Sequence, residues 1–440
     1  MLKVRNHLSV YYRIFSCMIF QYNTTMESLK TDETSSSSIA KVHSLFYKDR
    51  PEKACKQLTG FLVDRKISEE EIRSRYEWIK TKRLKSNDTV KDQNRVTRKV
   101  YFPDTLCGLY CARFSSDGET IATTYGSGCI QLRNGETGEL RVTIRSSLET
   151  SLPVTCCRFH PIQKEILYAA SACGSIFICK LDNIEFWKFV EELDNEINAL
   201  DVNISGDFIA SGGKDASLKV YDAETGKVNT LEFIYKIKNL LKNYQKDKAN
   251  LITENAVRFH HMKIFSIKCH QTNKNVIVTG GWDDTVKIWD TRVGDGSIRS
   301  MHGPHICGDA IDLQVMFPSI INRAIFKDTN ILTGSWTVKD SLQIWDFSSA
   351  KLIETVNPTN REASLSGEFL YSARYFDGDP YGDHVLVGGS GTGNVEVINL
   401  KEKSIVARFM ANKAVVAIDS YKSSIVYGGM DPVISIADYN

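Results

Sequence analysis

Three side chains that could do chemistry lie within one short stretch, Gly303–Asp312 (GPHICGDAID). His305, Cys307 and Asp309 supply an imidazole, a thiol and a carboxylate at alternate positions. A thiol and an imidazole can form a nucleophile pair, and these side chains can also bind metal ions. No oxyanion-stabilising element or third catalytic group can be identified. We therefore interpret the stretch as a structural turn or a recognition loop.

The elements that would position this loop are clearest in the stretch just before it, Ile277–Arg292 (IVTGGWDDTVKIWDTR). Its first three residues are a β-branched run, which favours a strand. Two glycines break the run, and Asp283-Asp284 supplies turn chemistry. Apolar and polar residues alternate again from Val286 onward, which predicts a second strand. The stretch therefore reads as a hairpin that ends in Trp289-Asp290.

The same pattern recurs along the chain, which makes seven copies in all. The other copies are Thr120–Asn134, Glu165–Leu181, Phe208–Asp222, Asn330–Asp346, His384–Asn399 and Ser424–Asp438. The chain thus resembles the WD-repeat β-propeller family, whose repeats end in a Trp-Asp pair. The resemblance implies an all-β, seven-bladed propeller in which each copy contributes one four-stranded blade.

The two ends of the repeat region favour ring closure. The seventh copy reaches Asn440 directly after its third strand, and a strand-like run, Arg95–Phe102 (RVTRKVYF), precedes the first copy. The resemblance implies that this N-terminal strand completes the last blade, which would remove an exposed edge. The alternative is that the run is only a linker.

The resemblance also implies a structural tetrad inside well-formed blades. It joins a turn Asp, a His, a Ser or Thr, and the Trp, because buried polar groups must bond to one another. In blade four the matching residues are His260, Thr279, Asp283 and Trp289, although Phe259 stands where the family has Gly. Blade three keeps Ser211, Asp215 and Tyr221. We interpret all of these residues as structural.

A tetrad turn lies, by the same resemblance, on the top face of a propeller, where the residue before the turn Asp points toward partners. Those residues are Lys214, Trp282, Trp336 and Met430. Two tryptophans on adjacent blades favour a binding site, because Trp is enriched at binding hot spots. His305 and Asp309 should lie on this face too. The alternative is that each Trp packs on a neighbouring loop.

A further motif, Trp289-Asp290-Thr291-Arg292, is similar to the sixteen-residue pattern of WD-repeat substrate receptors of cullin-RING ubiquitin ligases. In those receptors the Arg lies on the opposite face and engages the ligase adaptor. The resemblance therefore implies that Asp290 and Arg292 contact an adaptor. The alternative is that Arg292 is an ordinary surface charge.

Composition limits the partners and the compartment. The 440-residue chain has a net charge of +2, which gives no strong nucleic-acid footprint. No stretch reaches the ~18 apolar residues of a membrane span. Leu8–Phe20 resembles a short signal peptide, but Arg13 interrupts it, and translation from Met26 is an alternative. None of the eleven cysteines forms a CxxC pair, so we expect free thiols in a reducing compartment, the cytoplasm or the nucleus.

We expect two regions in the chain. We predict that residues 1–94 form a partly disordered extension with helices over about 40–62 and 69–84. We predict that residues 95–440 form the propeller. An insertion at Phe233–Arg258 is a short amphipathic helix or a loop. A second, apolar insertion at residues 314–326 either packs on a partner or is not normally part of the protein.

These observations predict a non-enzymatic protein-interaction scaffold in a multiprotein complex, with no cofactor and no metal. A partner would dock on the top face near blades four and five, with Trp282 and Trp336 as apolar anchors. The alternative function is a ubiquitin-ligase substrate receptor that uses Arg292.

Overall fold

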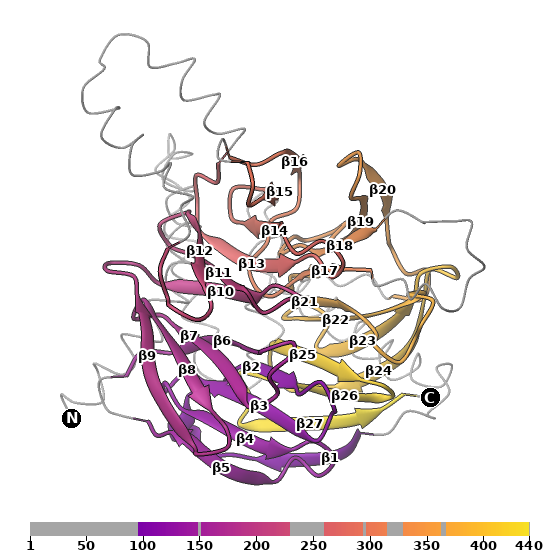
Figure 1. Ribbon diagram of the computed structural model, residues 1–440. Helices are drawn as coiled ribbons and strands as arrows, with labels where there is room; N and C mark the ends of the chain where they lie inside the picture. Colours follow the sequence, from indigo (N-terminus) through magenta and orange to yellow (C-terminus); the bar gives the residue numbers. More distant parts are fainter. Residues whose placement is uncertain are drawn as a thin grey trace, which may run out of the picture. The chain divides into compact units, whose positions relative to one another are not determined.

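The computed structural model describes residues 96–147, 151–228, 259–293, 296–314, 329–361 and 367–439. These residues form 27 β-strands and one 3-10 helix, η2 (Asp104–Leu106). The strands lie in seven antiparallel sheets arranged around a ring, which confirms the predicted seven-bladed propeller (Figure 1). The predicted N-terminal helices, the insertion at 233–258 and residues 315–326 lie outside the described residues.

The first three blades follow the chain order. Blade one contains β2 (Leu109–Phe114), β3 (Thr120–Tyr125), β4 (Ile130–Asn134) and β5 (Leu140–Arg145). Blade two contains β6 (Val154–Phe159), β7 (Ile166–Ser171), β8 (Ser175–Lys180) and β9 (Glu185–Glu191). In blade three the structure describes β10 (Ile197–Val202), β11 (Phe208–Gly213) and β12 (Leu218–Asp222).

The remaining blades repeat this arrangement. Blade four contains β13 (Ile264–Cys269), β14 (Val276–Gly281), β15 (Thr285–Asp290) and β16 (Arg299–His302). Blade five contains β17 (Ile311–Leu313), β18 (Asn330–Gly334), β19 (Leu342–Asp346) and β20 (Leu352–Thr355). Blade six contains β21 (Leu370–Tyr375), β22 (His384–Gly389), β23 (Asn394–Asn399) and β24 (Ser404–Met410).

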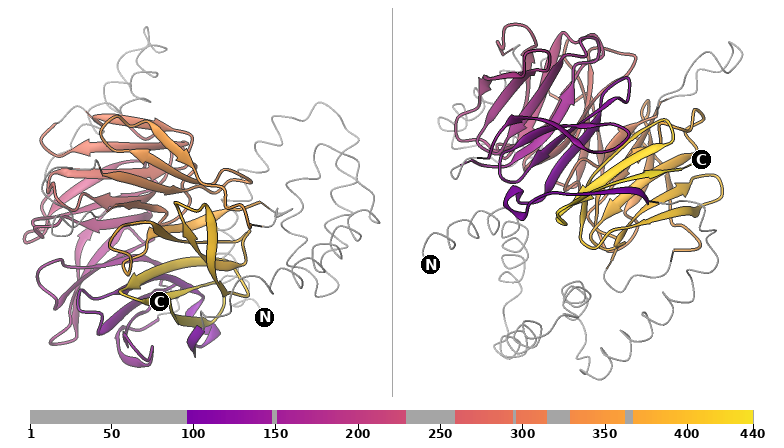
Figure 2. Two further views of the ribbon diagram at one scale, coloured as in Figure 1. Left: turned by 90° about the vertical axis from the view of Figure 1, so that its right-hand side faces the viewer. Right: turned by 90° about the horizontal axis from the view of Figure 1, so that it is seen from below.

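Blade seven joins the two ends of the propeller. Its strands are β25 (Val415–Tyr421), β26 (Ser424–Gly429), β27 (Val433–Asp438) and the N-terminal β1 (Val96–Tyr101). β1 pairs antiparallel with β27, with Tyr101 opposite Val433, so the predicted closure is confirmed. Figure 2 shows the indigo β1 beside the yellow strands of blade seven. The first strands contact one another in sequence around the ring, and β25 contacts β2.

The core lies between blades. Second strands such as β14 are buried along their whole length, because each blade is covered on both faces by its neighbours. Outer strands such as β9 are largely exposed. Buried apolar side chains therefore form clusters that span two or three successive blades. Among the described residues no helix is long and apolar enough to cross a membrane.

Gly280 and Gly281 end the β-branched run, as the sequence indicated, but they still pair within the sheet as the last two residues of β14. A side chain on Gly281 would collide with the carbonyl oxygen of Lys263, and one on Gly280 would collide with Ile306 and Ile311 of blade five. The glycines therefore allow close approach of neighbouring segments rather than a turn.

The turns between the second and third strands of all blades lie on one face of the ring. Because the strands alternate in direction, the turn between the second and third strands lies at the same end as the connection to the next blade. We call this face the top face. It carries the turns after β11, β14, β18 and β26 and the connection Gly303–Asp312.

Candidate interaction surface

The predicted tetrad residues of blade four are joined by hydrogen bonds. The Trp289 indole N–H donates to Thr279 Oγ1 at 2.7 Å, and Thr279 Oγ1 lies 2.7 Å from His260 Nε2. His260 Nδ1 lies 2.8 Å from Asp283 Oδ2. This network assigns the proton of the neutral ring to Nδ1, so that Thr279 donates to Nε2. Phe259 does not displace His260, since its ring packs 6.2 Å from that of Trp289.

Burial sets the charges of this tetrad. Burial lowers the pKa of the His260 imidazole, although Asp283 opposes the shift. Burial alone would raise the pKa of Asp283, but hydrogen bonds from His260 and Thr285 lower it to about 2. The Asp283 carboxylate is therefore ionised, and it holds the turn between β14 and β15 in place on the top face.

In blade three the buried polar side chains are paired through Glu192, a residue that the sequence pattern did not predict. Glu192 is only 5% exposed and accepts hydrogen bonds from Ser211 Oγ and from the Tyr221 hydroxyl at 2.9 Å. Lys219 forms ion pairs with both Glu192 (2.6 Å) and Asp215 (2.7 Å). Ser211, Asp215 and Tyr221 are thus linked through Glu192 and Lys219, and Glu192 takes the place that His260 has in blade four.

Five rings form a continuous row across the top face of blades four, five and six. We call Phe265, Trp282, His305, Trp336 and Phe369 the aromatic row. Successive ring centroids lie 5.0, 6.3, 6.3 and 4.8 Å apart. Three of these residues were predicted to face partners, whereas Phe265 and Phe369 were not identified, because each lies at the start of a first strand where an apolar residue reads as core.

The members of the aromatic row differ in exposure. Trp282 is only 7% exposed, and its indole N–H donates to Cys307 Sγ at 3.3 Å. Trp336 and Phe369 are half-buried, and the His305 side chain is 27% exposed. His305 Nδ1 lies 2.6 Å from the exposed Asp284 carboxylate. The accessible part of the row is therefore centred on His305 and Trp336, with Trp282 supporting it from below.

Lys214 reaches the aromatic row through a chain of charges. Its ammonium group pairs with Glu196 at 3.0 Å, and the same carboxylate lies 3.4 Å from Lys263 Nζ. Lys263 Nζ in turn lies 5.4 Å from the centroid of the Trp282 ring, which is a cation–π distance. The blade-three side of the row is thus polar, with both signs of charge exposed.

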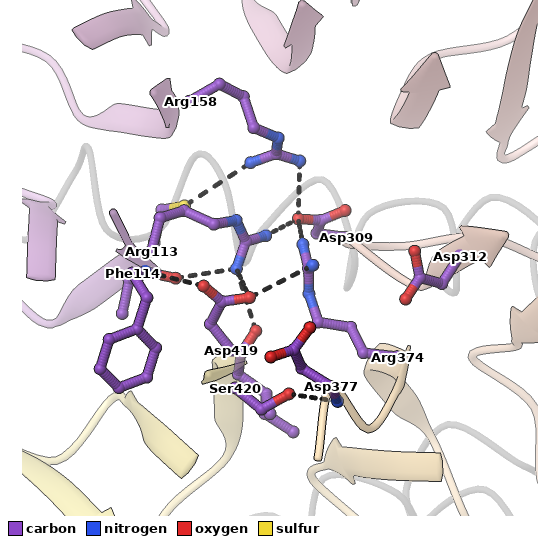
Figure 3. A network of polar contacts seen from close by, with 12 residues as sticks. Arg113, Phe114, Arg158, Asp309, Asp312, Arg374, Asp377, Asp419 and Ser420 are labelled. Atoms are coloured by element: carbon purple, nitrogen blue, oxygen red, sulfur yellow. Dashed lines mark hydrogen bonds and ion pairs between the residues drawn. The ribbon is translucent and has the colours of Figure 1, made fainter. Parts of the chain in front are cut away.

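Asp309 lies apart from the aromatic row, in the central channel. Its Oδ2 atom forms ion pairs with Arg113, with Arg158 at 2.9 Å and with Arg374 at 3.0 Å (Figure 3). Burial alone would raise the pKa of the Asp309 carboxyl, but the guanidinium groups of Arg158, Arg113 and Arg374 hold it well below its usual value. Asp309 therefore joins blades one, two and six through one carboxylate oxygen.

The three arginines belong to a ring of charges around the channel. Every blade contributes one charged residue at the same register of its first strand: Arg113, Arg158, Asp201, Lys268, Asp312, Arg374 and Asp419. The sign alternates around this charge ring except between blades one and two. Seven positions cannot alternate completely, so two arginines are neighbours there, and Asp309 supplies the missing negative charge.

Each of the three aspartates of the charge ring bonds to both neighbouring blades, and the geometry is the same in all three. One carboxylate oxygen accepts from the base of the preceding blade, in the pairs Arg158–Asp201 (3.2 Å), Lys268–Asp312 (3.0 Å) and Arg374–Asp419 (3.3 Å). The other oxygen accepts a backbone N–H of the following blade, from Cys269 (2.7 Å), Tyr375 (3.0 Å) and Phe114 (2.8 Å) respectively.

The side chains that could have formed a nucleophile pair point to different partners. His305 contacts Asp284, and Asp309 contacts the channel arginines. Cys307 is buried against Trp282, and burial raises the pKa of its thiol to about 12. A thiol with this pKa is a poor nucleophile at neutral pH. No group of three or more potential metal ligands occurs among the described residues.

Comparison with known proteins supports the propeller assignment. The family model of the WD domain, G-beta repeat, matches residues 254–290, and that of the anaphase-promoting complex subunit 4 WD40 domain matches residues 158–239. The chain belongs to the WD-repeat family. WD-repeat propellers mediate protein interactions, so the fold is consistent with an interaction scaffold.

Several curated WD-repeat-like relatives are similar over part of the chain. Protein tipD of Dictyostelium discoideum is 22% identical over 58% of this chain and 42% of its own length. A diphthine methyltransferase homolog of the same organism is 23% identical, over 38% of this chain and 41% of its own. A guanine nucleotide-binding protein subunit beta-like protein of Encephalitozoon cuniculi is 26% identical, over 39% and 61% respectively. The matched part thus spans less than two thirds of each relative.

Blade seven lacks the Trp of the WD-repeat signature, and a large side chain on its second strand replaces it. Ala437 occupies the strand position that Trp289 has in blade four, and Tyr427 occupies the position of Thr279. Tyr427 is 1% exposed and donates its hydroxyl proton to the Met410 carbonyl at 3.1 Å. A large residue on the second strand thus fills the space that a small residue leaves on the third. Met430, after β26, packs against Gly108 at the junction with blade one.

The Asp290–Arg292 pair lies on the face opposite the aromatic row, since it follows the end of the third strand of blade four. Arg292 donates from Nε to Asp290 Oδ1 at 2.9 Å and from Nη2 to Oδ2 at 2.6 Å. This fork-like pairing orients the guanidinium, whose side chain remains 65% exposed.

Proposed function

We propose that this WD-repeat propeller is a non-enzymatic scaffold that docks a partner protein on the aromatic row of its top face. The observation that carries the proposal is the continuity of the row, in which rings from blades four, five and six lie side by side. Half-buried aromatic residues in a rigid setting are typical anchors of protein interfaces. His305 and Trp336 would contact the partner, and Trp282 would hold His305 in place.

A rigid support strengthens this proposal. The His305 carbonyl accepts the Trp336 backbone N–H at 2.8 Å, and Ile306 donates its backbone N–H to the Gly281 carbonyl at 3.1 Å. Asp309 anchors the other end of the same connection in the channel. A preorganised surface loses little conformational entropy on binding, which favours affinity. One similar protein is named for a methyltransferase, but the reactive side chains of Gly303–Asp312 point apart, which supports a binding role.

We expect His305→Ala and Trp336→Ala each to weaken partner binding at least ~10-fold, because each removes an exposed part of the anchor. Affinity purification with quantitative mass spectrometry from native lysate measures this loss against wild type. Met430→Ala is the matched control, since Met430 holds the corresponding turn position in blade seven. Unchanged thermal stability of His305→Ala shows that the fold is kept. Partners lost with Met430→Ala and retained by both row variants would contradict the proposal.

A second candidate function is a substrate receptor of a cullin-RING ubiquitin ligase. The observation that favours it is the exposed guanidinium of Arg292, held in a fixed orientation by Asp290. In this case Arg292→Ala removes co-purified cullin and adaptor, whereas Arg299→Ala, an exposed arginine of the same blade, does not. If neither protein is recovered with wild type under conditions that preserve other ligase complexes, this candidate fails.

A further inference from the structure

Blade two carries an unusual outer strand. β9 is seven residues long and lies at the edge of its sheet, paired with β8 on one side only (Figure 1). No described residue pairs with the main-chain groups of its outer edge. Edge strands of this kind can pair with another chain, and proteins usually protect them with charge, proline or short length. β9 carries exposed charges, but it also exposes two large aromatic side chains, Phe186 and Trp187, which are 41% and 39% accessible.

The two rings lie on opposite faces of blade two, because successive residues of a strand point to opposite sides. Phe186 packs edge-on against Phe177 of β8 at 6.1 Å, and Trp187 lies 5.6 Å from the Lys180 ammonium group. A strand added beyond β9 would therefore meet an exposed aromatic ring on both of its faces. Cross-strand contacts of aromatic with β-branched residues stabilise such pairing.

The charge around β9 is mainly acidic. The exposed acids of the strand and its two flanking turns are Asp182, Glu185, Glu191 and Asp194, against two exposed lysines, Lys180 and Lys188. Lys188 is already paired with Glu191 at 2.8 Å. A second copy of this chain would bring the same acidic edge against itself, and like charges oppose such pairing. The chemistry therefore favours a basic partner over self-association.

We propose that the outer edge of β9 binds an extended basic segment of a partner protein, which adds to blade two as a fifth strand. Main-chain hydrogen bonds supply the pairing, Phe186 and Trp187 contact apolar side chains at alternate positions, and the flanking acids select lysine or arginine. This surface lies on the rim of blade two. It is independent of the aromatic row, which lies on blades four to six.

Hydrogen–deuterium exchange of the full chain tests the proposal with three synthetic octapeptides. One alternates lysine with valine, one alternates glutamate with valine, and one has the lysines with proline in place of valine. We expect the lysine–valine peptide alone to slow exchange of the β9 amides. The β20 amides are the internal reference, because β20 is also an outer strand with exposed apolar residues, Leu352 and Ile353.

Two variants separate the contributions. Phe186→Ser/Trp187→Ser should weaken lysine–valine binding at least ~10-fold, whereas the matched Leu352→Ser/Ile353→Ser should leave it unchanged. Glu185→Lys/Glu191→Lys should shift the preference toward the glutamate peptide. Equal protection of β20, equal binding of the glutamate peptide to wild type, or equal binding of the proline peptide would each overturn the proposal. Unchanged exchange in β6, β7 and β8 shows that the variants are folded.

Discussion

Asp309→Asn should lower the free energy of unfolding by about 3–5 kcal/mol, the usual cost of removing one partner from a buried ion pair. The substitution keeps the shape of the side chain but removes the charge that Arg113, Arg158 and Arg374 share. Their side chains are only 7, 11 and 10% exposed, so solvent screens them little. Equilibrium denaturation in urea, followed by circular dichroism, measures the loss.

The pH dependence provides a second readout for Asp309. Its pKa is lowered in the folded state, so the carboxylate stabilises the fold above the unfolded pKa of ~3.9, and this contribution is lost as pH falls through the folded pKa. The gap between wild type and Asp309→Asn should therefore be constant from about pH 7 to 5 and should shrink in stronger acid. A gap that widens in acid would contradict this account.

Two further variants control for the position and the chemistry. Asp284→Asn lies in the same region, but its side chain is 65% exposed, so we expect a loss of no more than about 1 kcal/mol. Arg113→Gln combined with Asp309→Asn should cost less than the two single losses together, because the double variant no longer places two uncompensated arginines side by side. Additive losses would show that Asp309 does not balance the charge ring.

The repeat pattern predicted the architecture because each copy carries its own hairpin. Even blade seven, which lacks the Trp, keeps the alternation Val433–Asp438 and pairs as expected. What the pattern did not reveal was how degenerate blades fill their cores. In blade seven Tyr427 on one strand compensates for the small Ala437 on the next. In the sequence each residue alone indicates only an apolar strand position.

The charge ring was predictable in principle from an alignment of the first strands. In six of the seven strands a charged residue lies between apolar neighbours, as in Ala112-Arg113-Phe114 and Ile267-Lys268-Cys269, and in blade seven Asp419 follows the apolar Ile418. The central role of Asp309 was not predictable in this way, because it lies outside that register, in the connection two residues before β17. Its function follows from the odd number of blades, which only the closed ring makes visible.

The aromatic row shows the limit of turn-based prediction. Because Trp282 and Trp336 precede the turn position, the motif placed both on the top face. It could not predict which of the two rings is exposed and which is buried as a support. That difference depends on Cys307 and Phe265, which come from other segments and cover Trp282. Exposure at a binding surface is a property of several blades together, whereas a motif describes one.

Thr279→Val should destabilise the protein by about 2–4 kcal/mol, because it breaks the tetrad of blade four without changing its volume. The hydroxyl accepts from Trp289 and contacts His260 Nε2, both at 2.7 Å, and all of these groups are buried. Valine leaves the indole N–H and the imidazole nitrogen unpaired, and each unpaired buried group costs about 1–3 kcal/mol. Chemical denaturation monitored by Trp fluorescence measures the effect.

Blade five offers the matched control for this tetrad. Thr333 accepts from Trp345 at 3.1 Å and donates to a backbone carbonyl at 3.3 Å, with no imidazole in the network. Thr333→Val should therefore cost at least about 1 kcal/mol less than Thr279→Val. Thr279→Ser keeps the hydroxyl and should lose only the energy of one buried methyl, about 1 kcal/mol. Equal losses for the two valine variants would show that His260 and Asp283 add nothing to blade four, and that its turn is held by packing alone.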